Sequence, residues 1–271
     1  MRRWDREFLL KCLCICGLLW YILAVRPGVG QVYNWLEDTI QGENLARRIS
    51  APEGFMRVPV ESGSFADWLR NLPVKEADTA VYLYNDQIKQ NQAAHVAVLD
   101  IDTGTRNLQQ CADAVIRLRA EYLFSVGALQ GIHFNFTSGD TAWYLKWAQG
   151  FRPVIDENRV SWTQSGESDS SYDNFRQYLE IVMTYAGTYS LAKELVRVGS
   201  IDQMKIGDVF IQGGFPGHAV LVTDMAVNHE TGKHMFLLAQ SFMPAQDIHI
   251  LRNPDHPDDP WYPREFGSRL R

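Results

Sequence analysis

Apolar residues recur at helical spacing through the middle of the chain and at strand spacing toward its end. The clearest helical stripe, in alternating steps of three and four, is formed by Leu108, Cys111, Val115, Leu118 and Tyr122. This spacing predicts an amphipathic helix, with Arg117 and Glu121 mostly off the apolar stripe. We expect a second long helical region over residues 175–198, bent at Gly187.

Short apolar or alternating runs predict strands, and half of these runs lie in the last quarter of the chain. They cover residues 80–84, 95–101, 133–136, 208–212, 218–224 and 235–241. The stretch 161–173 is polar and serine-rich, and the tail after Asn253 is rich in proline, so we expect both to be irregular. Helices that precede an antiparallel sheet predict an α+β domain rather than alternating βαβ units.

A long apolar run, Phe8–Val25, stands near the start of the chain and contains a single charge, that of Lys11. Its 18 residues would span roughly 27 Å as a helix, close to the hydrocarbon thickness of a bilayer. Because Arg2, Arg3 and Arg6 precede the run, we expect a cytoplasmic N-terminus and an extracytoplasmic domain. An uncleaved signal anchor is the favoured interpretation. A cleaved signal peptide, which would give a secreted protein, is the alternative.

The charge of the chain is concentrated after this run. Residues 1–26 hold five of the 26 basic and two of the 32 acidic residues, which leaves 21 against 30, or −9, for the remainder. An acidic domain without a basic patch binds nucleic acid poorly, so we expect no nucleic-acid partner and membrane contact through residues 8–25. The chain is therefore divided into the signal segment 1–26, a linker or tether over 27–53, and a single α+β domain over 54–271.

Cys111 is the only cysteine beyond the N-terminal apolar run, because Cys12, Cys14 and Cys16 lie inside it. A thiol in the first turn of a helix lies at the positive end of the helix dipole, which favours the thiolate. A core position is the alternative, since Cys111 lies on the apolar stripe and cysteines outside disulfides are among the most buried residues.

A histidine and two polar residues complete a candidate site with this thiol. His218 opens an apolar strand after the glycine-rich stretch 213–217, and a histidine at a strand end can act as general base toward a thiol. Gln240 is polar within the apolar neighbouring strand, and its amide oxygen can accept the second ring N–H of the histidine. Asp224, on the histidine's own strand, is the alternative orienting residue.

These motifs are similar to those of the NlpC-type papain-like cysteine hydrolases, which are bacterial cell-wall amidases and endopeptidases. That group has a Gly-Asp strand and then a Gly- or Ser-His strand, as in Gly207-Asp208-Val209-Phe210-Ile211 and Gly217-His218-Ala219-Val220-Leu221-Val222. Its nucleophile opens a helix before these strands, as Cys111 does, although Gln110-Cys111-Ala112-Asp113 replaces the usual Asp-Cys-Ser-Gly. The resemblance implies a papain-like helix packed on an antiparallel sheet, and cell-wall peptides as substrates.

A second resemblance covers nearly the whole domain. Its residues are Leu108-Gln109-Gln110-Cys111-Ala112-Asp113, Arg117-Leu118-Arg119-Ala120-Glu121-Tyr122-Leu123 and Gln240-Ser241-Phe242-Met243-Pro244-Ala245-Gln246. The chain resembles an uncharacterised bacterial family, domain of unknown function 4846. This resemblance implies a bacterial origin and no particular activity.

We therefore expect an extracytoplasmic cysteine hydrolase, with Cys111 as nucleophile, His218 as base and Gln240 as orienting residue, acting on a cell-wall peptide or another amide. Gln109 and Gln110 either help to stabilise an oxyanion or are ordinary polar residues of a first helical turn. The rival hypothesis is a non-catalytic envelope binding or scaffolding module, which the altered cysteine motif favours. The sequence has no HExxH or Cys-His metal spacing and no phosphate-binding glycine loop, so we expect no metal and no cofactor.

Overall fold

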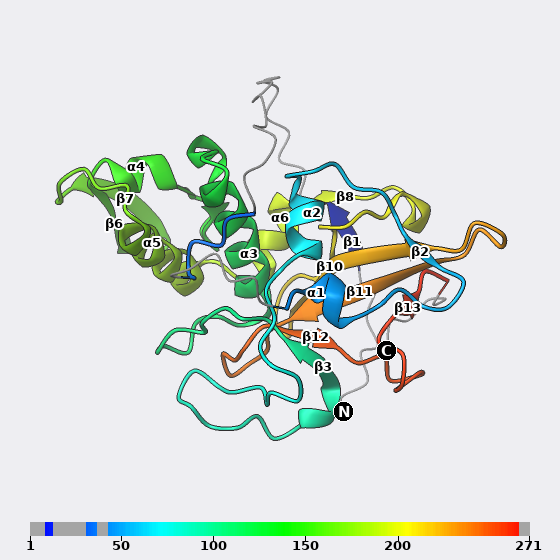
Figure 1. The fold of residues 1–271 in the computed structure, drawn as a ribbon. Helices are drawn as coiled ribbons and strands as arrows, with labels where there is room; N and C mark the ends of the chain where they lie inside the picture. The colour runs from blue at the N-terminus through cyan, green and yellow to red at the C-terminus, as the bar shows by residue number, and fades with distance from the viewer. Residues whose placement is uncertain (1–8, 13–30, 37–42, 266–271) are drawn as a thin grey trace.

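The computed structural model describes residues 9–12, 31–36 and 43–265 of the chain (Figure 1). Of the predicted anchor, Leu9–Cys12 form strand β1, and the other residues lie outside the described ranges. None of the helices in the described ranges is long and apolar enough to cross a membrane. The anchor and the orientation that it implies stay predictions.

The centre of the fold is a curled antiparallel sheet that comprises nine strands in the described part of the chain (Figure 1). Its main path runs through β3 (His95–Val98), β12 (His249–Leu251), β11 (His234–Gln240), β10 (His218–Val227), β9 (Val209–Gln212), β1 and β8 (Val196–Arg197). Off this path, β2 (Met56–Arg57) pairs with β10, and β13 (Tyr262–Pro263) pairs with β11. The longest strand, β10, therefore lies near the middle of the sheet.

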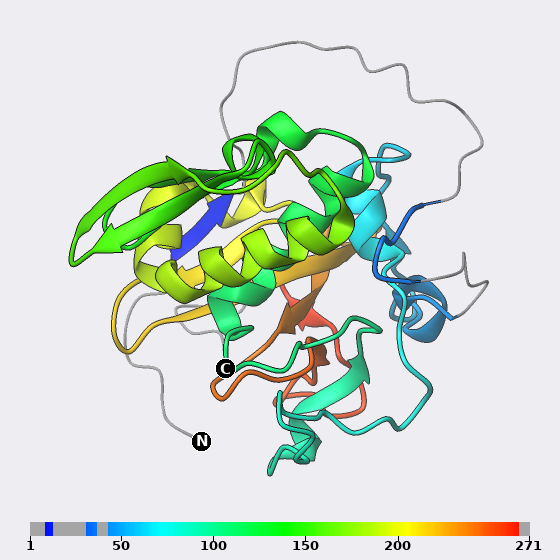
Figure 2. The same ribbon diagram turned by 90° about the vertical axis from the view of Figure 1, so that its left-hand side faces the viewer.

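Helices cover one face of this sheet, as Figure 2 shows for the green and yellow-green helices in front of the yellow and orange strands. The helices are α1 (Leu45–Arg48), α2 (Phe65–Arg70), α3 (Cys111–Ser125), α4 (Tyr144–Ala148), α5 (Tyr172–Tyr185) and α6 (Thr188–Glu194). Helix α3 packs directly on β10 and also contacts α2, α5 and α6. Two small hairpins, β4–β5 (His133–Asn135, Thr141–Trp143) and β6–β7 (Phe151–Asp156, Arg159–Gln164), lie outside the main sheet.

Strand β10 separates two clusters of buried apolar side chains. Ala219 and Leu221 belong to the main core, whereas Val220 and Val222 belong to a smaller core that also contains Phe236. This alternation follows from the two-residue period of a strand. Since burying one large aliphatic side chain contributes about 1.5–3 kcal/mol, β10 is held firmly from both faces. Leu45 and Ile49, which fall in the predicted tether, also lie in the main core.

Helix α3 is buried on more sides than its apolar stripe predicts. Arg117 and Glu121, which lie off the stripe, are both 0 % exposed. The Arg117 side chain donates to Glu121 Oε1 at 2.9 Å and to the backbone oxygen of Asp102 at 2.8 Å, and Tyr172 from α5 donates to the same Glu121 oxygen. The stripe residues Val115 and Leu118 are buried too, so α3 is buried on its apolar stripe and on the side opposite to it. A buried arginine–carboxylate pair joins α3 to α5 on the other side.

The predicted α+β class with an antiparallel sheet is confirmed. The helix predicted from the apolar stripe is α3, and Gly187 separates α5 from α6. The strands predicted over residues 208–212, 218–224 and 235–241 correspond to β9, β10 and β11.

Three other expectations differ from the structure. Residues 80–84 form isolated bridges rather than a strand, through Tyr82 with Ile88 and Leu83 with Gln246. The predicted loop 161–173 begins inside β7, and the tail contributes β13 to the sheet. Strand β7 was missed because none of its side chains is buried, so its sequence lacks the apolar alternation of a strand with one buried face.

Candidate active site

Cys111 is the first residue of α3, as the sequence predicts. The turn is closed by Asp113, whose Oδ2 accepts the backbone N–H of Gln110 at 3.0 Å. The nearby backbone N–H groups of Cys111 and Ala112 lower the pKa of the thiol and so favour its ionised form. The thiol therefore lies where unpaired N–H groups at the start of a helix concentrate positive potential.

The thiol also contacts the start of β10. The thiol lies beside the backbone N–H of Ala219, which lowers its pKa, and Ala219 directly follows His218 in the chain. Packing of α3 on β10 thus brings the cysteine to the end of the strand that carries the histidine. The two residues are more than a hundred positions apart in the sequence.

His218 and Gln240 are joined across β10 and β11. The Nε2 atom of His218 lies 2.8 Å from Oε1 of Gln240. His218 is 6 % exposed, and the ring of Phe242 lies edge-on to its imidazole, with ring centroids 5.3 Å apart. The structure therefore brings His218 and Gln240 into contact, and it places the Cys111 thiol beside Ala219, the residue that follows His218.

Two hydrogen bonds connect the segment after Gln240 to the segment before Cys111. The Ser241 hydroxyl lies 2.7 Å from the backbone oxygen of Gln109, and the backbone N–H of Ala245 donates to Asn107 Oδ1 at 2.7 Å. Both bonds span more than 130 residues of sequence. They hold the start of α3 against the end of β11, which fixes Cys111 relative to the strand that carries Gln240.

Burial determines the resting protonation of the cysteine and the histidine. Burial raises the pKa of the Cys111 thiol, the Ala219 N–H lowers it, and the charge of Asp113 raises it further, so that the net shift is upward. Burial lowers the pKa of His218, and the hydrogen bond to Gln240 opposes this shift only in part. Since the ordinary values are about 8.5 and 6.5, a neutral thiol beside a neutral imidazole is the resting pair near pH 7.

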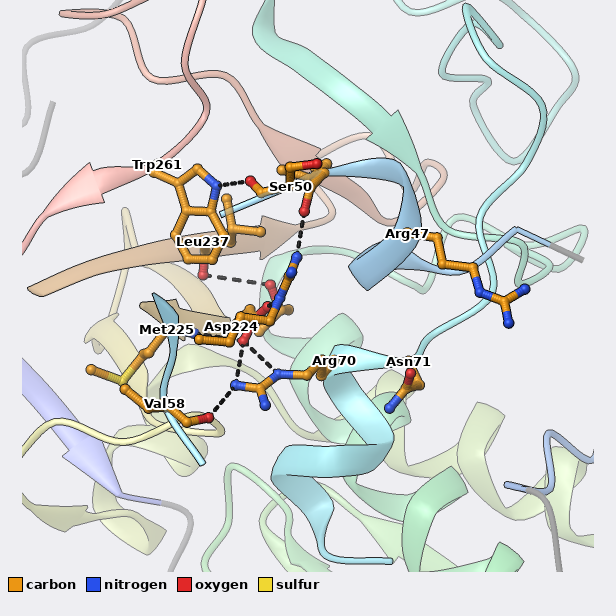
Figure 3. A network of polar contacts seen from close by, with 12 residues as sticks. Arg47, Ser50, Val58, Arg70, Asn71, Asp224, Met225, Leu237 and Trp261 are labelled. Carbon is orange, nitrogen blue, oxygen red and sulfur yellow. Dashed lines mark hydrogen bonds and ion pairs between the residues drawn. The ribbon is translucent and has the colours of Figure 1, made fainter. Parts of the chain in front are cut away.

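Asp224, the alternative orienting residue, is bound by two arginines away from His218. Its carboxylate accepts from Arg57 Nε at 2.6 Å and from Arg70 Nε at 2.8 Å, and Figure 3 shows it beside Arg70, with Val58 and Met225 nearby. Six residues along a strand place it roughly 20 Å from His218. Asp224 therefore pairs β10 with β2 and α2 and does not reach the imidazole.

The two glutamines before the cysteine also have partners away from the thiol. Gln109 is buried, and its Oε1 accepts from Arg117 at 2.9 Å, while the side-chain amide of Gln110 donates to Asn107 Oδ1 at 3.3 Å. The donors that remain beside the sulfur are backbone N–H groups. Their position at the start of α3 is suited to an oxyanion that forms next to Cys111.

His249 is a buried residue of the site that the sequence interpretation passed over. It lies opposite Gln240 on β12, and its Nε2 is 3.4 Å from the side-chain nitrogen of Gln240. Metal spacing was the criterion for the remaining histidines, and His249 fails that criterion. The informative signal was its place between Ile248 and Ile250, since a polar side chain flanked by apolar ones in a strand needs a specific partner.

Exposed apolar side chains adjoin the site in two loops. Phe215, in the loop before His218, is 96 % exposed, and Met243, in the loop after Gln240, is 58 % exposed. The Thr188 hydroxyl at the start of α6 donates to the backbone oxygen of Gly214 at 3.0 Å and anchors the first loop. The loop before His218 and the loop after Gln240 therefore each present an apolar side chain to solvent.

Comparison with known proteins places the chain within a family. The model of a family described as "Domain of unknown function (4846)" matches residues 45–271. No curated protein and no solved structure matches the chain. The matched range includes the cysteine, the histidine and the glutamine of the site.

Proposed function

We propose that the chain, which belongs to the family of domain of unknown function 4846, is a cysteine hydrolase that cleaves or transfers amide bonds. Cys111 is the nucleophile, His218 the general base and Gln240 the residue that orients the imidazole. The observation that carries the proposal is the 2.8 Å contact of His218 with Gln240 at the end of the sheet where the Cys111 thiol lies beside the backbone N–H of Ala219, the residue after His218.

The neutral resting pair suits general-base activation. His218 takes the thiol proton while the sulfur attacks the carbonyl carbon of the amide, and the carbonyl oxygen becomes an oxyanion near the N–H groups at the start of α3. The imidazolium then protonates the departing amine as the carbon–nitrogen bond breaks, which leaves a thioester on Cys111. His218 next deprotonates a water or an acceptor amine, whose attack on the thioester releases the product and returns the proton to the sulfur.

We infer a papain-like arrangement from the order of these parts along the chain. A helix that begins with the nucleophile packs on an antiparallel sheet, the base opens a central strand, and the orienting residue lies on the next strand. The segment between α3 and β8 is a helical insertion relative to that arrangement. By the resemblance to NlpC-type hydrolases, the substrate is a cell-wall peptide. The arginines before the predicted anchor imply that the domain is extracytoplasmic.

The test is digestion of purified peptidoglycan by the full-length chain, with released muropeptides followed by mass spectrometry. Cys111→Ser and His218→Ala should each remain folded and lose turnover, by about 10²–10⁴-fold for the histidine, and the double variant should lose no more than the worse single variant. Gln240→Ala should lose less because it only orients the ring. His229→Ala, at an exposed histidine, is the matched control. Turnover by Cys111→Ser equal to that of the unaltered chain would exclude the proposal.

A non-catalytic binding module is the second candidate function, because His218 is almost fully buried and burial raises the pKa of the thiol. In that case the three side chains are structural, and Cys111→Ser should bind peptidoglycan as tightly as the unaltered chain, with neither protein releasing muropeptides. A sedimentation assay with insoluble peptidoglycan separates the two functions, since it measures binding without turnover.

A further inference from the structure

A row of polar side chains crosses three strands of the sheet and extends the contact of His218 with Gln240. The Gln240 side-chain nitrogen lies 3.4 Å from Nε2 of His249, and Lys89 Nζ lies 3.3 Å from the same ring atom. The other ring nitrogen of His249, Nδ1, lies 2.9 Å from the backbone oxygen of Asp247. His249 is 0 % exposed, so these neighbours determine which of its nitrogens carries the proton.

Two of these neighbours can act in only one way. A backbone oxygen only accepts hydrogen bonds, so the Asp247 contact requires a proton on Nδ1 of His249. A lysine ammonium only donates, so the Lys89 contact requires a lone pair on Nε2. Burial, and next the charge of Lys89, lower the pKa of His249 to about 3, with a weaker contribution from His95, so the ring is neutral near pH 7. Both contacts assign the same tautomer, with Nδ1 protonated and Nε2 a hydrogen-bond acceptor.

This tautomer determines the orientation of the Gln240 amide. Because His249 Nε2 accepts a hydrogen bond, the NH₂ group of Gln240 must face it. The amide oxygen of Gln240 then faces His218. That oxygen only accepts, so Nε2 of His218 must carry a proton. The basic nitrogen of His218 is then Nδ1.

We propose that His249 is a positioning residue: by accepting from Gln240 it holds the amide oxygen on His218 Nε2 and keeps His218 in the tautomer whose Nδ1 is the base. The inference rests on the proposed function, because only there does Nδ1 of His218 act as a general base. The tautomer itself is a property of the resting protein and can be measured whether or not the protein turns over a substrate.

The first measurement uses the unaltered full-length chain with ¹⁵N-labelled histidine. Long-range ¹H–¹⁵N correlation spectra at pH 7 distinguish a protonated ring nitrogen from one with a lone pair, and single His→Leu variants assign the signals. We expect protonated Nδ1 in His249 and protonated Nε2 in His218. A His249 that carries its proton on Nε2, or a His218 that carries it on Nδ1, would overturn the proposal, because both tautomers are read in the unaltered chain.

The second measurement compares two substitutions that differ in one acceptor. His249→Leu removes the acceptor, so the Gln240 amide can rotate and His218 should become a mixture of tautomers. His249→Gln offers an amide oxygen to Gln240 and Lys89, so a single His218 tautomer should be retained. His229→Leu controls for the loss of an exposed histidine. If His249→Leu is folded by its thermal melting curve and still shows only Nε2 protonation in His218, His249 does not position the site.

Turnover separates this inference from the proposed function. If the proposed function and the positioning role of His249 both hold, His249→Leu lowers kcat and leaves KM nearly unchanged, whereas His249→Gln retains the kcat of the unaltered chain. If Cys111→Ser is as active as the unaltered chain, the hydrolase proposal fails while the tautomer measurements still decide the role of His249. If the tautomers are as expected but kcat is unaffected in His249→Leu, the positioning role is overturned and the hydrolase proposal stands.

Discussion

At the scale of single residues, the site combines two opposing effects on one sulfur. Backbone N–H groups of α3 and β10 favour the thiolate of Cys111, while its burial and the nearby Asp113 carboxylate oppose it. The opposing effects prevail, and burial also lowers the pKa of His218. The resting protonation therefore differs from the thiolate–imidazolium pair of some cysteine enzymes, and under the proposed function the thiol needs a base at the moment of reaction.

The alkylation rate of Cys111 by iodoacetamide should follow this upward pKa shift. We expect its midpoint to lie above the ordinary value of about 8.5, because the thiolate is the reacting form. Mass spectrometry of the tryptic peptide 107–117 reports on this cysteine separately from those near the N-terminus. Asp113→Asn should lower the midpoint, since it removes a negative charge beside the sulfur. A midpoint below about 7 would indicate a thiolate–imidazolium pair instead.

The acidic limb of the pH profile of turnover should report the protonation of His218. Only neutral imidazole can take the thiol proton, and burial lowers the pKa of His218. We therefore expect kcat/KM on peptidoglycan to rise with pH through a midpoint below about 6.5 and to stay high near pH 7. An acidic midpoint above 7 would contradict the lowered pKa.

Residue types and chain order were enough to single out Cys111 and His218 as candidates, since a lone thiol at a helix start and a histidine at a strand start are visible in the sequence. Gln240 was the preferred partner from the sequence, and Asp224 was the alternative. The choice between them depends on two distant arginines that occupy Asp224, and no local pattern reveals those arginines. His249 was missed for a similar reason, because its meaning comes from its neighbour on another strand.

At the scale of elements, the position of His218 depends on how β10 begins. A side chain added at Gly217 would overlap the Thr188 hydroxyl of α6 and the backbone oxygen of Gly214. The loop before the strand is thus closely packed against α6, and the glycine permits this approach. Farther along, the pairing of β10 with β11 shifts register between Val222 and Asp224, where the two arginines bind.

Gly217→Ala should therefore displace the start of β10 and with it the base. We expect a loss of about 1–3 kcal/mol in the free energy of unfolding, measured by urea denaturation, because overpacking forces nearby atoms to move. Turnover should fall by more than that loss of stability explains, since His218 is the next residue. Gly187→Ala is the control, because an added side chain there meets nothing within 4 Å. Equal behaviour of the two variants would show that the start of β10 is not closely packed.

Elements with one buried face could be predicted, and those without one could not. Strands β9, β10 and β11 are rich in apolar residues because their positions are buried. Strand β13 is two residues long and exists through pairing with β11, so its own sequence carries little signal. The face of α3 that carries Arg117 and Glu121 looked exposed in the sequence, because a buried ion pair consists of the same charged residue types as an exposed surface.

At the scale of the whole molecule, two buried groups near the site give opposite pH dependences of stability. Burial raises the pKa of Asp113 to about 7, so between about pH 4 and 7 the folded state binds more protons than the unfolded state and stability falls as pH rises. Burial lowers the pKa of His249 to about 3, so between pH 3 and about 6.5 the unfolded state binds more protons and stability rises with pH. The two slopes largely cancel.

Asp113→Asn should make this cancellation visible. Without the carboxylic acid, the free energy of unfolding should rise with pH, relative to the unaltered chain, by on the order of 1.4 kcal/mol per pH unit between about pH 4 and 7. The amide oxygen can still accept the Gln110 N–H, so the start of α3 should persist. Urea denaturation at several pH values measures the effect, with Asp86→Asn as an exposed control. Parallel curves for the variant and the unaltered chain would show that Asp113 ionises in the folded protein as it does in the unfolded one.

The most direct test of the central claim is to trap the thioester on Cys111. Peptidoglycan is mixed with the full-length chain and quenched in acid, and the peptide 107–117 is then analysed by mass spectrometry. We predict a muropeptide-sized adduct on this peptide in the unaltered chain, none in His218→Ala, and a slower appearance in Gln240→Ala. Release of muropeptides at the same rate by Cys111→Ser, with peptide 107–117 of the unaltered chain always unmodified, would contradict the account.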